Sequence, residues 1–248
     1  GKLAASRVDG MERAQLVLID GRTETPLIDA FPYNSFDSGA KLLVWDELVS
    51  DAKFDRSRFR IMLYDTESRK KKVLADDSLF SYPAIKSDDS VAAAVEQSKD
   101  GSSSIVLLST ADGSEIRRYS IGAGEAASDL SFSPDGKKLL YVSNGVFYPA
   151  EAQGKRICSL DLESGIATVL LDAGWENVKQ PAASGDAVFY VSSWSGIESI
   201  YALLPDGTRH QVVSRPIGVG YPVPSASADV LYFIDHADSR GKTVCAAP

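Results

Sequence analysis

A unit of about 46 residues repeats along the chain, and this period constrains the fold more than any other feature. Its best-preserved copy is SFSPDGKKLLYVS at 131–143. There Pro134 presets φ for a turn, Asp135 can bond its own backbone, and Gly136 tolerates positive φ, so the segment predicts a turn between two strands. In the similar segments, the first apolar residue after the turn is Leu42, Val91, Leu139, Val188 or Val230.

A second series of hairpins lies between these copies, and it begins at Leu16, Ile61, Ile105, Ile157 and Ile200. Each repeat therefore holds two hairpins, or four short strands, which is the pattern of a β-propeller blade. A β-sandwich would also show frequent turns, but it would not repeat in units of four strands. The predicted fold class is all-β, a β-propeller in which residues 1–248 form a single domain.

The five copies of the first hairpin predict five four-stranded blades. The chain opens with a second hairpin and ends on a first hairpin, so we expect the N-terminal strands to complete the last blade and close the ring. The chain nevertheless holds one more candidate strand than five blades need, because 16–19 and 243–246 both have strand character. Six blades therefore remain the alternative.

The charge balance limits the partners that the protein can have. The chain carries 34 acidic and 26 basic residues, a formal net charge of −8. Nucleic acid and anionic membrane surfaces are disfavoured as partners, because either would need a basic face. No stretch approaches the roughly 18 apolar residues of a membrane-spanning helix. Cys158 and Cys245 fall in apolar runs and are expected to be buried thiols.

Two turn motifs stand close together between residues 128 and 171. A Ser-Pro-Asp-Gly turn precedes an apolar strand in SFSPDGKKLLYVS, and an Asp-x-x-x-Gly turn follows the next strand in ICSLDLESGIATVLL. This combination resembles the TolB-like (WD40-like) β-propeller repeat family. The other copies are degenerate, but the resemblance covers nearly the whole chain. It is specific for the fold rather than for the function.

The resemblance implies a ring of blades used mainly for protein–protein contacts, often outside the cytoplasm in bacteria. Related propellers are also gating domains of serine peptidases and, rarely, metal-dependent lyases that act on pectate fragments. The fold does not choose among these functions. We expect a non-catalytic binding module with a protein or peptide partner. The alternatives are a carbohydrate-binding or lyase-like propeller with a weak cation site, and the gating propeller of a hydrolase.

The loops between blades and those inside blades emerge on one face of a propeller, and here they are rich in aromatic residues. Aromatic rings beside amides suit a peptide, a partner loop or a sugar. The binding residues predicted on this face are Tyr33, Asn34, Tyr82, Tyr148, Trp175, Asn177, Trp194, Tyr221 and His236. For Tyr82 and Tyr221 the alternative is packing where each blade begins, because both precede a proline at the same place in the repeat.

The sequence contains no identifiable catalytic constellation. His236, flanked by Asp235 and Asp238, is the only histidine placed where a ligand could reach it, whereas a catalytic metal site usually has about three side-chain ligands. Ser193 and Ser195 lack an identifiable partner pair of histidine and acid. We therefore expect no catalytic residue, no metal and no cofactor.

Overall fold

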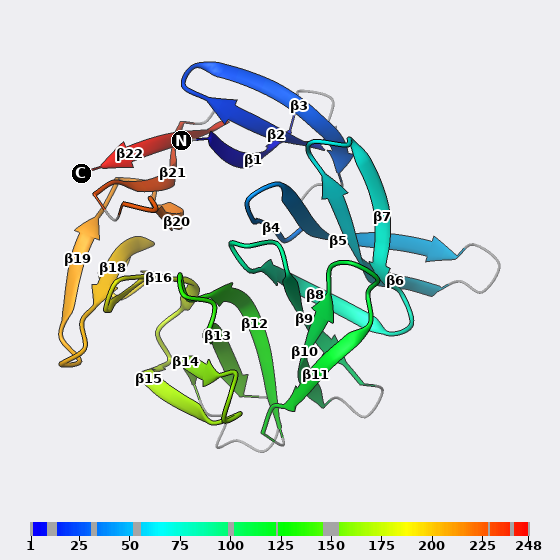
Figure 1. Ribbon diagram of the computed structural model, residues 1–248. Coiled ribbons are helices and arrows are strands. Elements are labelled where there is room, and N and C mark those ends of the chain that lie inside the picture. The colour runs from blue at the N-terminus through cyan, green and yellow to red at the C-terminus, as the bar shows by residue number, and fades with distance from the viewer. Residues whose placement is uncertain are drawn as a thin grey trace. The chain divides into compact units, whose positions relative to one another are not determined.

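The structure is a computed structural model that describes residues 2–8, 14–30, 34–51, 56–98, 102–122, 124–145, 154–227, 229–238 and 241–247. All of the regular elements in these residues are β-strands (Figure 1). No helix in this part of the chain is long and apolar enough to cross a membrane. The strands form six antiparallel sheets, which are the blades of a β-propeller. They group into two compact units, Gly1–Ser120 and Ile121–Pro248, here called unit 1 and unit 2.

Unit 1 contains the first three blades, and each blade is built from strands that follow one another in the chain. Blade 1 consists of β1 (Lys2–Val8), β2 (Ala14–Asp20) and β3 (Thr23–Ala30). Blade 2 consists of β4 (Phe36–Ser38), β5 (Leu42–Asp51), β6 (Arg56–Asp65) and β7 (Lys70–Ala75). Blade 3 consists of β8 (Leu79–Ile85), β9 (Val91–Gln97), β10 (Ser103–Ser109) and β11 (Glu115–Ser120).

Unit 2 contains the other three blades, which follow one another in chain order (Figure 1). Blade 4 consists of β12 (Glu125–Phe132), β13 (Lys138–Gly145), β14 (Lys155–Asp161) and β15 (Ala167–Gly174). Blade 5 consists of β16 (Val178–Ser184), β17 (Ala187–Ser192), β18 (Ser199–Leu203) and β19 (Arg209–Val213). Blade 6 consists of β20 (Val219–Pro224), β21 (Leu231–Asp238) and β22 (Gly241–Ala247).

The preferred count of five blades is wrong, and the alternative of six is confirmed. The N-terminal strands do not complete the last blade, because β1 pairs with β2 along its whole length, from Lys2 opposite Asp20 to Val8 opposite Ala14. At the other end of the chain, β22 pairs with β21 and contains the second candidate strand, 243–246. Both candidate strands thus exist, each in a separate three-stranded blade. The missed strand β1, KLAASRV, has few large apolar residues.

The hydrophobic core lies between neighbouring blades. In unit 1, Val44 and Ile61 of blade 2 pack in one cluster with Phe80, Ala92 and Val106 of blade 3. The middle strands are covered on both faces, which is why Ala92–Val95 of β9 forms an unbroken apolar run rather than an alternating one. Unit 2 has equivalent clusters between blades 4 and 5 and between blades 5 and 6. The Cys158 side chain is buried and Cys245 is half-buried.

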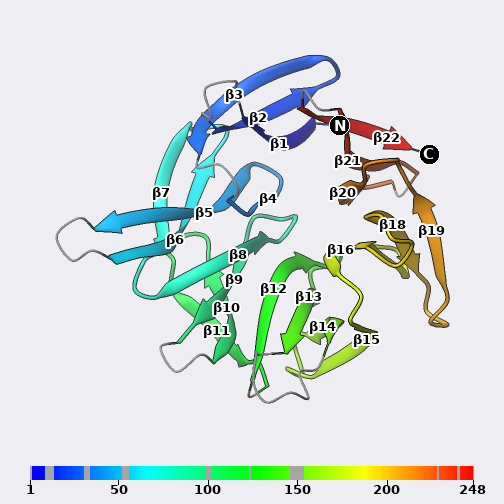
Figure 2. The ribbon, with the colours of Figure 1, turned by 180° about the vertical axis from the view of Figure 1, so that it is seen from behind.

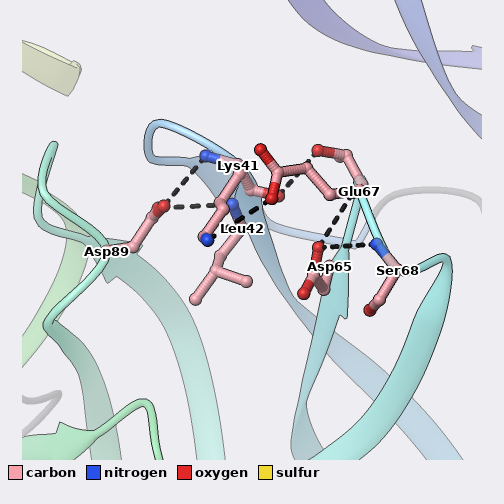
Figure 3. A network of polar contacts seen from close by, with 7 residues as sticks. Lys41, Leu42, Asp65, Glu67, Ser68 and Asp89 are labelled. Atoms are coloured by element: carbon pink, nitrogen blue, oxygen red, sulfur yellow. Dashed lines mark hydrogen bonds and ion pairs between the residues drawn. The ribbon is translucent and has the colours of Figure 1, made fainter.

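Three carboxylates fasten blade 2 to blade 3 by accepting hydrogen bonds from backbone amides. The N–H groups of Lys41 and Leu42 donate to the two oxygens of Asp89 at 2.9 and 3.2 Å (Figure 3). In the opposite direction, Ile85 N–H donates to Asp37 and Tyr82 N–H donates to Asp46, at 2.9 and 3.2 Å. The boundary between these blades is therefore held by buried and half-buried charges as well as by apolar packing.

Candidate functional site

Three loops of unit 2 meet at blade 5. They follow β15, β17 and β19, and span 175–177, 193–198 and 214–218. The first two are joined reciprocally, since Asn177 N–H donates to Ser193 Oγ and Ser193 N–H donates to the Asn177 carbonyl, both at 3.1 Å. Val219 N–H donates to the Glu198 carbonyl at 2.9 Å and connects the second loop to the third. The loops therefore form one continuous surface at this end of the unit.

This surface exposes large apolar side chains. Trp175 is 86% exposed and Trp194 is 64% exposed, on two loops that are hydrogen-bonded to each other. Ile197 and Ile217, from the second and third loops, are also exposed. We call these four residues the tryptophan face. Exposed apolar side chains are ordinary when scattered singly, but a group of them on adjoining loops is typical of an interaction site.

A partly buried ion pair lies between the two tryptophan loops. Glu176 follows Trp175 directly, and its side chain is only 5% exposed. Its carboxylate accepts a hydrogen bond from Ser192 Oγ and pairs with Arg209 Nη1 at 2.9 Å. The guanidinium of Arg209 also lies over the Trp194 ring, 4.3 Å from the ring centroid, where a cation–π attraction operates. The pair thus holds the Trp194 ring directly and anchors the backbone next to Trp175 through Glu176.

The surroundings of this pair are polar. Ser192 Oγ accepts a hydrogen bond from Trp194 N–H at 2.9 Å, and this fixes the backbone of the second loop. Lys155 Nζ donates to Asn177 Oδ1 at 2.6 Å, so the predicted binding residue Asn177 faces a cation. Burial raises the pKa of the Tyr190 hydroxyl beside Arg209, which keeps that group protonated. The geometry provides a preorganised apolar surface on a polar base.

Tyr82 and Tyr221 occupy the same special position in two blades. Each lies in the inner strand of its blade, where the register skips two residues, and each has a positive φ, 50° and 55°. Their backbones fasten blade to blade: Tyr82 N–H donates to Asp46, and Tyr221 N–H donates to Gln180 Oε1 at 2.8 Å. The two tyrosines are 37% and 51% exposed. The backbone of each thus performs the packing role between blades.

The other predicted residues are placed as follows. Asn34 is half-buried in unit 1, just before β4. His236 is half-buried in β21, and its N–H donates to the Gly218 carbonyl at 3.0 Å. Asp235 pairs with Arg215 at 3.3 Å, so the acid next to His236 already has a cationic partner. Tyr33 and Tyr148 lie outside the described residues.

Within the described part of the chain, no three His, Cys, Asp or Glu side chains are close enough together to hold a metal ion. The residues of this candidate site that the sequence did not indicate are Glu176, Ile197, Arg209 and Ile217. Glu176 could have been noticed as an acid beside a loop tryptophan, whereas Arg209 comes from a different hairpin and had no sequence signal.

Comparison with known proteins places the fold. No family model and no curated protein matches the sequence. Among solved structures, a protein described as a TolB from Agrobacterium tumefaciens aligns with a TM-score of 0.68 and 20% identity over 86% of this chain and 73% of that protein. TolB from Acinetobacter baumannii aligns with a TM-score of 0.66 and 15% identity over 99% of this chain and 65% of that protein. The chain has the fold of the TolB-type β-propellers.

Enzymes also share the TolB-type fold. Oligogalacturonate lyase in complex with manganese aligns with a TM-score of 0.62 and 16% identity, covering 96% of this chain and 74% of that protein. Acylaminoacyl peptidases match as well, and this chain covers 49% of the one from Pyrococcus horikoshii. At such identities the likeness establishes the fold alone.

Proposed function

We propose that this protein is a non-catalytic binding module and that the tryptophan face of unit 2 holds a protein or peptide partner. The observation that carries the proposal is the pair of exposed tryptophans on joined loops, one of which, Trp194, is held by Arg209 of the Glu176–Arg209 pair. Trp and Arg are enriched among the residues that dominate binding energy at protein interfaces. A side chain held in place before binding loses less conformational entropy when the partner arrives. An exported location, implied by the resemblance to TolB-like propellers, is part of the same proposal.

The test is a selection of random 12-residue peptides displayed on phage against the immobilised full chain. We expect enriched peptides that bind the wild type and lose about tenfold or more affinity for the W175A/W194A variant. The matched control is I166A, because Ile166 is 64% exposed in the β14–β15 turn, away from the loop surface. It should leave binding unchanged. Equal binding to wild type and W175A/W194A would rule out the tryptophan face.

A thermal-shift experiment distinguishes the carbohydrate-binding or lyase-like alternative from the protein-binding module. The wild type is heated with galacturonate oligomers, with manganese, and with both together. A specific ligand raises the melting temperature by mass action, and our proposal expects no shift with any of these mixtures. A shift that requires both oligomer and metal would contradict the binding-module proposal and favour a lyase-like function.

A further inference from the structure

The charged side chains around the tryptophan face are already paired with one another. Four ion pairs lie at the loop end of unit 2: Glu125 with Arg156, Glu176 with Arg209, Glu198 with Lys179, and Asp235 with Arg215. A fifth cation, Lys155, donates to Asn177 and lies near the Asp129 carboxylate. Asp172 accepts a hydrogen bond from Gly174 N–H at 3.1 Å. Among the described side chains at this end of the unit, five cations thus stand against six acids, and the charge there is close to balanced.

The opposite end of unit 2 differs sharply in charge. It is formed by the hairpin turns, and its described charged residues are the acids Asp135, Asp161, Glu163, Asp186, Asp206 and Asp229 and the cations Lys137 and Lys138. Most of these turn carboxylates bond only their own turns, as Asp161 does with Ser164 N–H at 2.8 Å. The excess negative charge of the unit is therefore concentrated at the turn end, and the loop end is the less charged of the two.

We infer that the partner of the tryptophan face is a short segment of a protein that carries no net charge and presents apolar or aromatic side chains. This inference rests on the proposed function. A charged group brought onto the face would lose its hydration, and the nearby charges that could compensate it are engaged in the pairs described above. An uncharged apolar segment avoids that penalty and covers the exposed rings. The acidic turn end offers such a segment no comparable surface.

The experiment uses the peptides selected on the full chain. We expect their mean net charge to be close to zero, with at least two apolar or aromatic residues each. Their dissociation constants should change by less than about twofold between 0.05 and 0.5 M NaCl, because surface charge attraction is screened over this range while apolar contact is not. Peptides that are predominantly acidic or basic, with affinities that fall several-fold in high salt, would overturn the inference.

A variant that releases one charge makes the test sharper. In E198Q, Lys179 loses the carboxylate at 2.7 Å, whereas the Glu198 carbonyl that accepts from Val219 remains. We expect peptides selected on E198Q to gain acidic residues and a salt dependence that peptides selected on the wild type lack. An unchanged peptide composition on E198Q would count against the role of the paired charges.

The two proposals fail in different ways. Peptides that bind through Trp175 and Trp194 but are charged and sensitive to salt would overturn the inference and leave the binding function standing. Peptides that bind W175A/W194A as well as the wild type would overturn both.

Discussion

At the scale of single residues, Arg209 has two tasks that a surface arginine rarely combines. It neutralises the buried Glu176 carboxylate, and it covers one side of the Trp194 ring. Removing one partner of a buried pair leaves an uncompensated charge, which is far more damaging than losing an exposed ion pair. Glu176 and Arg209 are therefore positioning residues for the tryptophan face.

We expect R209A to lower the free energy of unfolding by about 3 kcal/mol, because Glu176 is left buried without its cation. The double variant E176Q/R209M, which removes both charges, should be less destabilised than R209A. Urea unfolding measures the stability. In a W175F background, where only Trp194 and the buried Trp45 emit, the change in emission between R209A and its parent reports on the surroundings of Trp194. An R209A protein as stable as the wild type would show that the pair has no structural role.

The carboxylates between blades 2 and 3 make stability depend on pH. Burial raises the pKa of Asp46 from 3.8 to about 6, although the N–H groups of Ser35 and Tyr82 oppose the shift. Asp37 is raised to about the same value, also by burial. A carboxyl whose pKa is higher in the folded state binds a proton that the unfolded chain releases between about pH 4 and 6. Stability therefore falls as the pH rises through this window.

The wild type should accordingly melt at a higher temperature at pH 5 than at pH 7, and D46N should show a smaller difference. Asp46 contributes about 2 kcal/mol at most to the difference in the free energy of unfolding between pH 5 and pH 7. The control is D161N, because hydrogen bonds from Ser164 lower the pKa of Asp161, and its effect is confined to more acidic solutions. The measurement is the melting temperature of the wild type, D46N and D161N between pH 4.5 and 7.5. A wild type that melts higher at pH 7 than at pH 5 would contradict the assignment.

At the scale of strands and turns, the joint between blades 2 and 3 depends on a close approach at Gly39. A Cβ placed on Gly39 would lie 2.0 Å from Asp89 Oδ1 and 2.8 Å from the Lys86 carbonyl. Asp89 could not then keep its bonds to the N–H groups of Lys41 and Leu42. The β4–β5 turn and the β8–β9 turn therefore fit together only with glycine at this position.

We expect G39A to destabilise the protein by about 3 kcal/mol or more, because the clash displaces a mostly buried carboxylate from its hydrogen bonds. The matched control is G122A, since the nearest atom to a Cβ at Gly122 is 3.6 Å away, an ordinary contact distance. Chemical unfolding of both variants is the measurement. If G39A lost no more free energy of unfolding than G122A, the close approach at Gly39 would not contribute to stability.

Irregularities in the strands have a regular placement. The innermost strands of blades 3 to 6 each skip two residues and contain a residue with positive φ, namely Tyr82, Asp129, Gln180 and Tyr221. The outermost strand of every blade is also irregularly paired with its neighbour. Bulges of this kind discourage pairing with another chain, so the outer edges are poor sites for strand addition.

At the scale of the whole molecule, acidification is expected to raise the stability of the fold and to lower the charge repulsion that keeps molecules apart. The net charge of −8 at pH 7 vanishes near the isoelectric point of about 4.9. Self-repulsion between molecules disappears there, while the buried carboxylates of blade 2 gain their protons. We expect light scattering to show most self-association near pH 5, although dilute protein melts at its highest temperature close to the same pH. Full solubility at pH 5 and aggregation at pH 7 would contradict this expectation.

The arrangement of the blades can be followed in two opposite views of the ribbon. Each sheet is made of consecutive strands, and within each unit the sheets follow the order of the chain (Figure 2). Such a chain forms its sheets from local hairpins, so the pairing of strands could be predicted from turn residues such as Pro134, Asp135 and Gly136. The number of blades was harder to predict from such turns. The strands β1 and β22 do not follow a turn of the kind that marks the first hairpin of each repeat.

The sequence by itself determined the all-β class, the four-stranded repeat and the resemblance to TolB-like propellers, since turn chemistry and apolar periodicity are local properties. It also indicated loop tryptophans as candidates for binding. Only the tertiary structure decided that there are six blades, that Arg209 joins Glu176 to the Trp194 ring, and that the described charges nearby are paired. These facts depend on which residues from separate hairpins meet in space, and no local pattern encodes a contact between Arg209 and a loop 33 residues earlier.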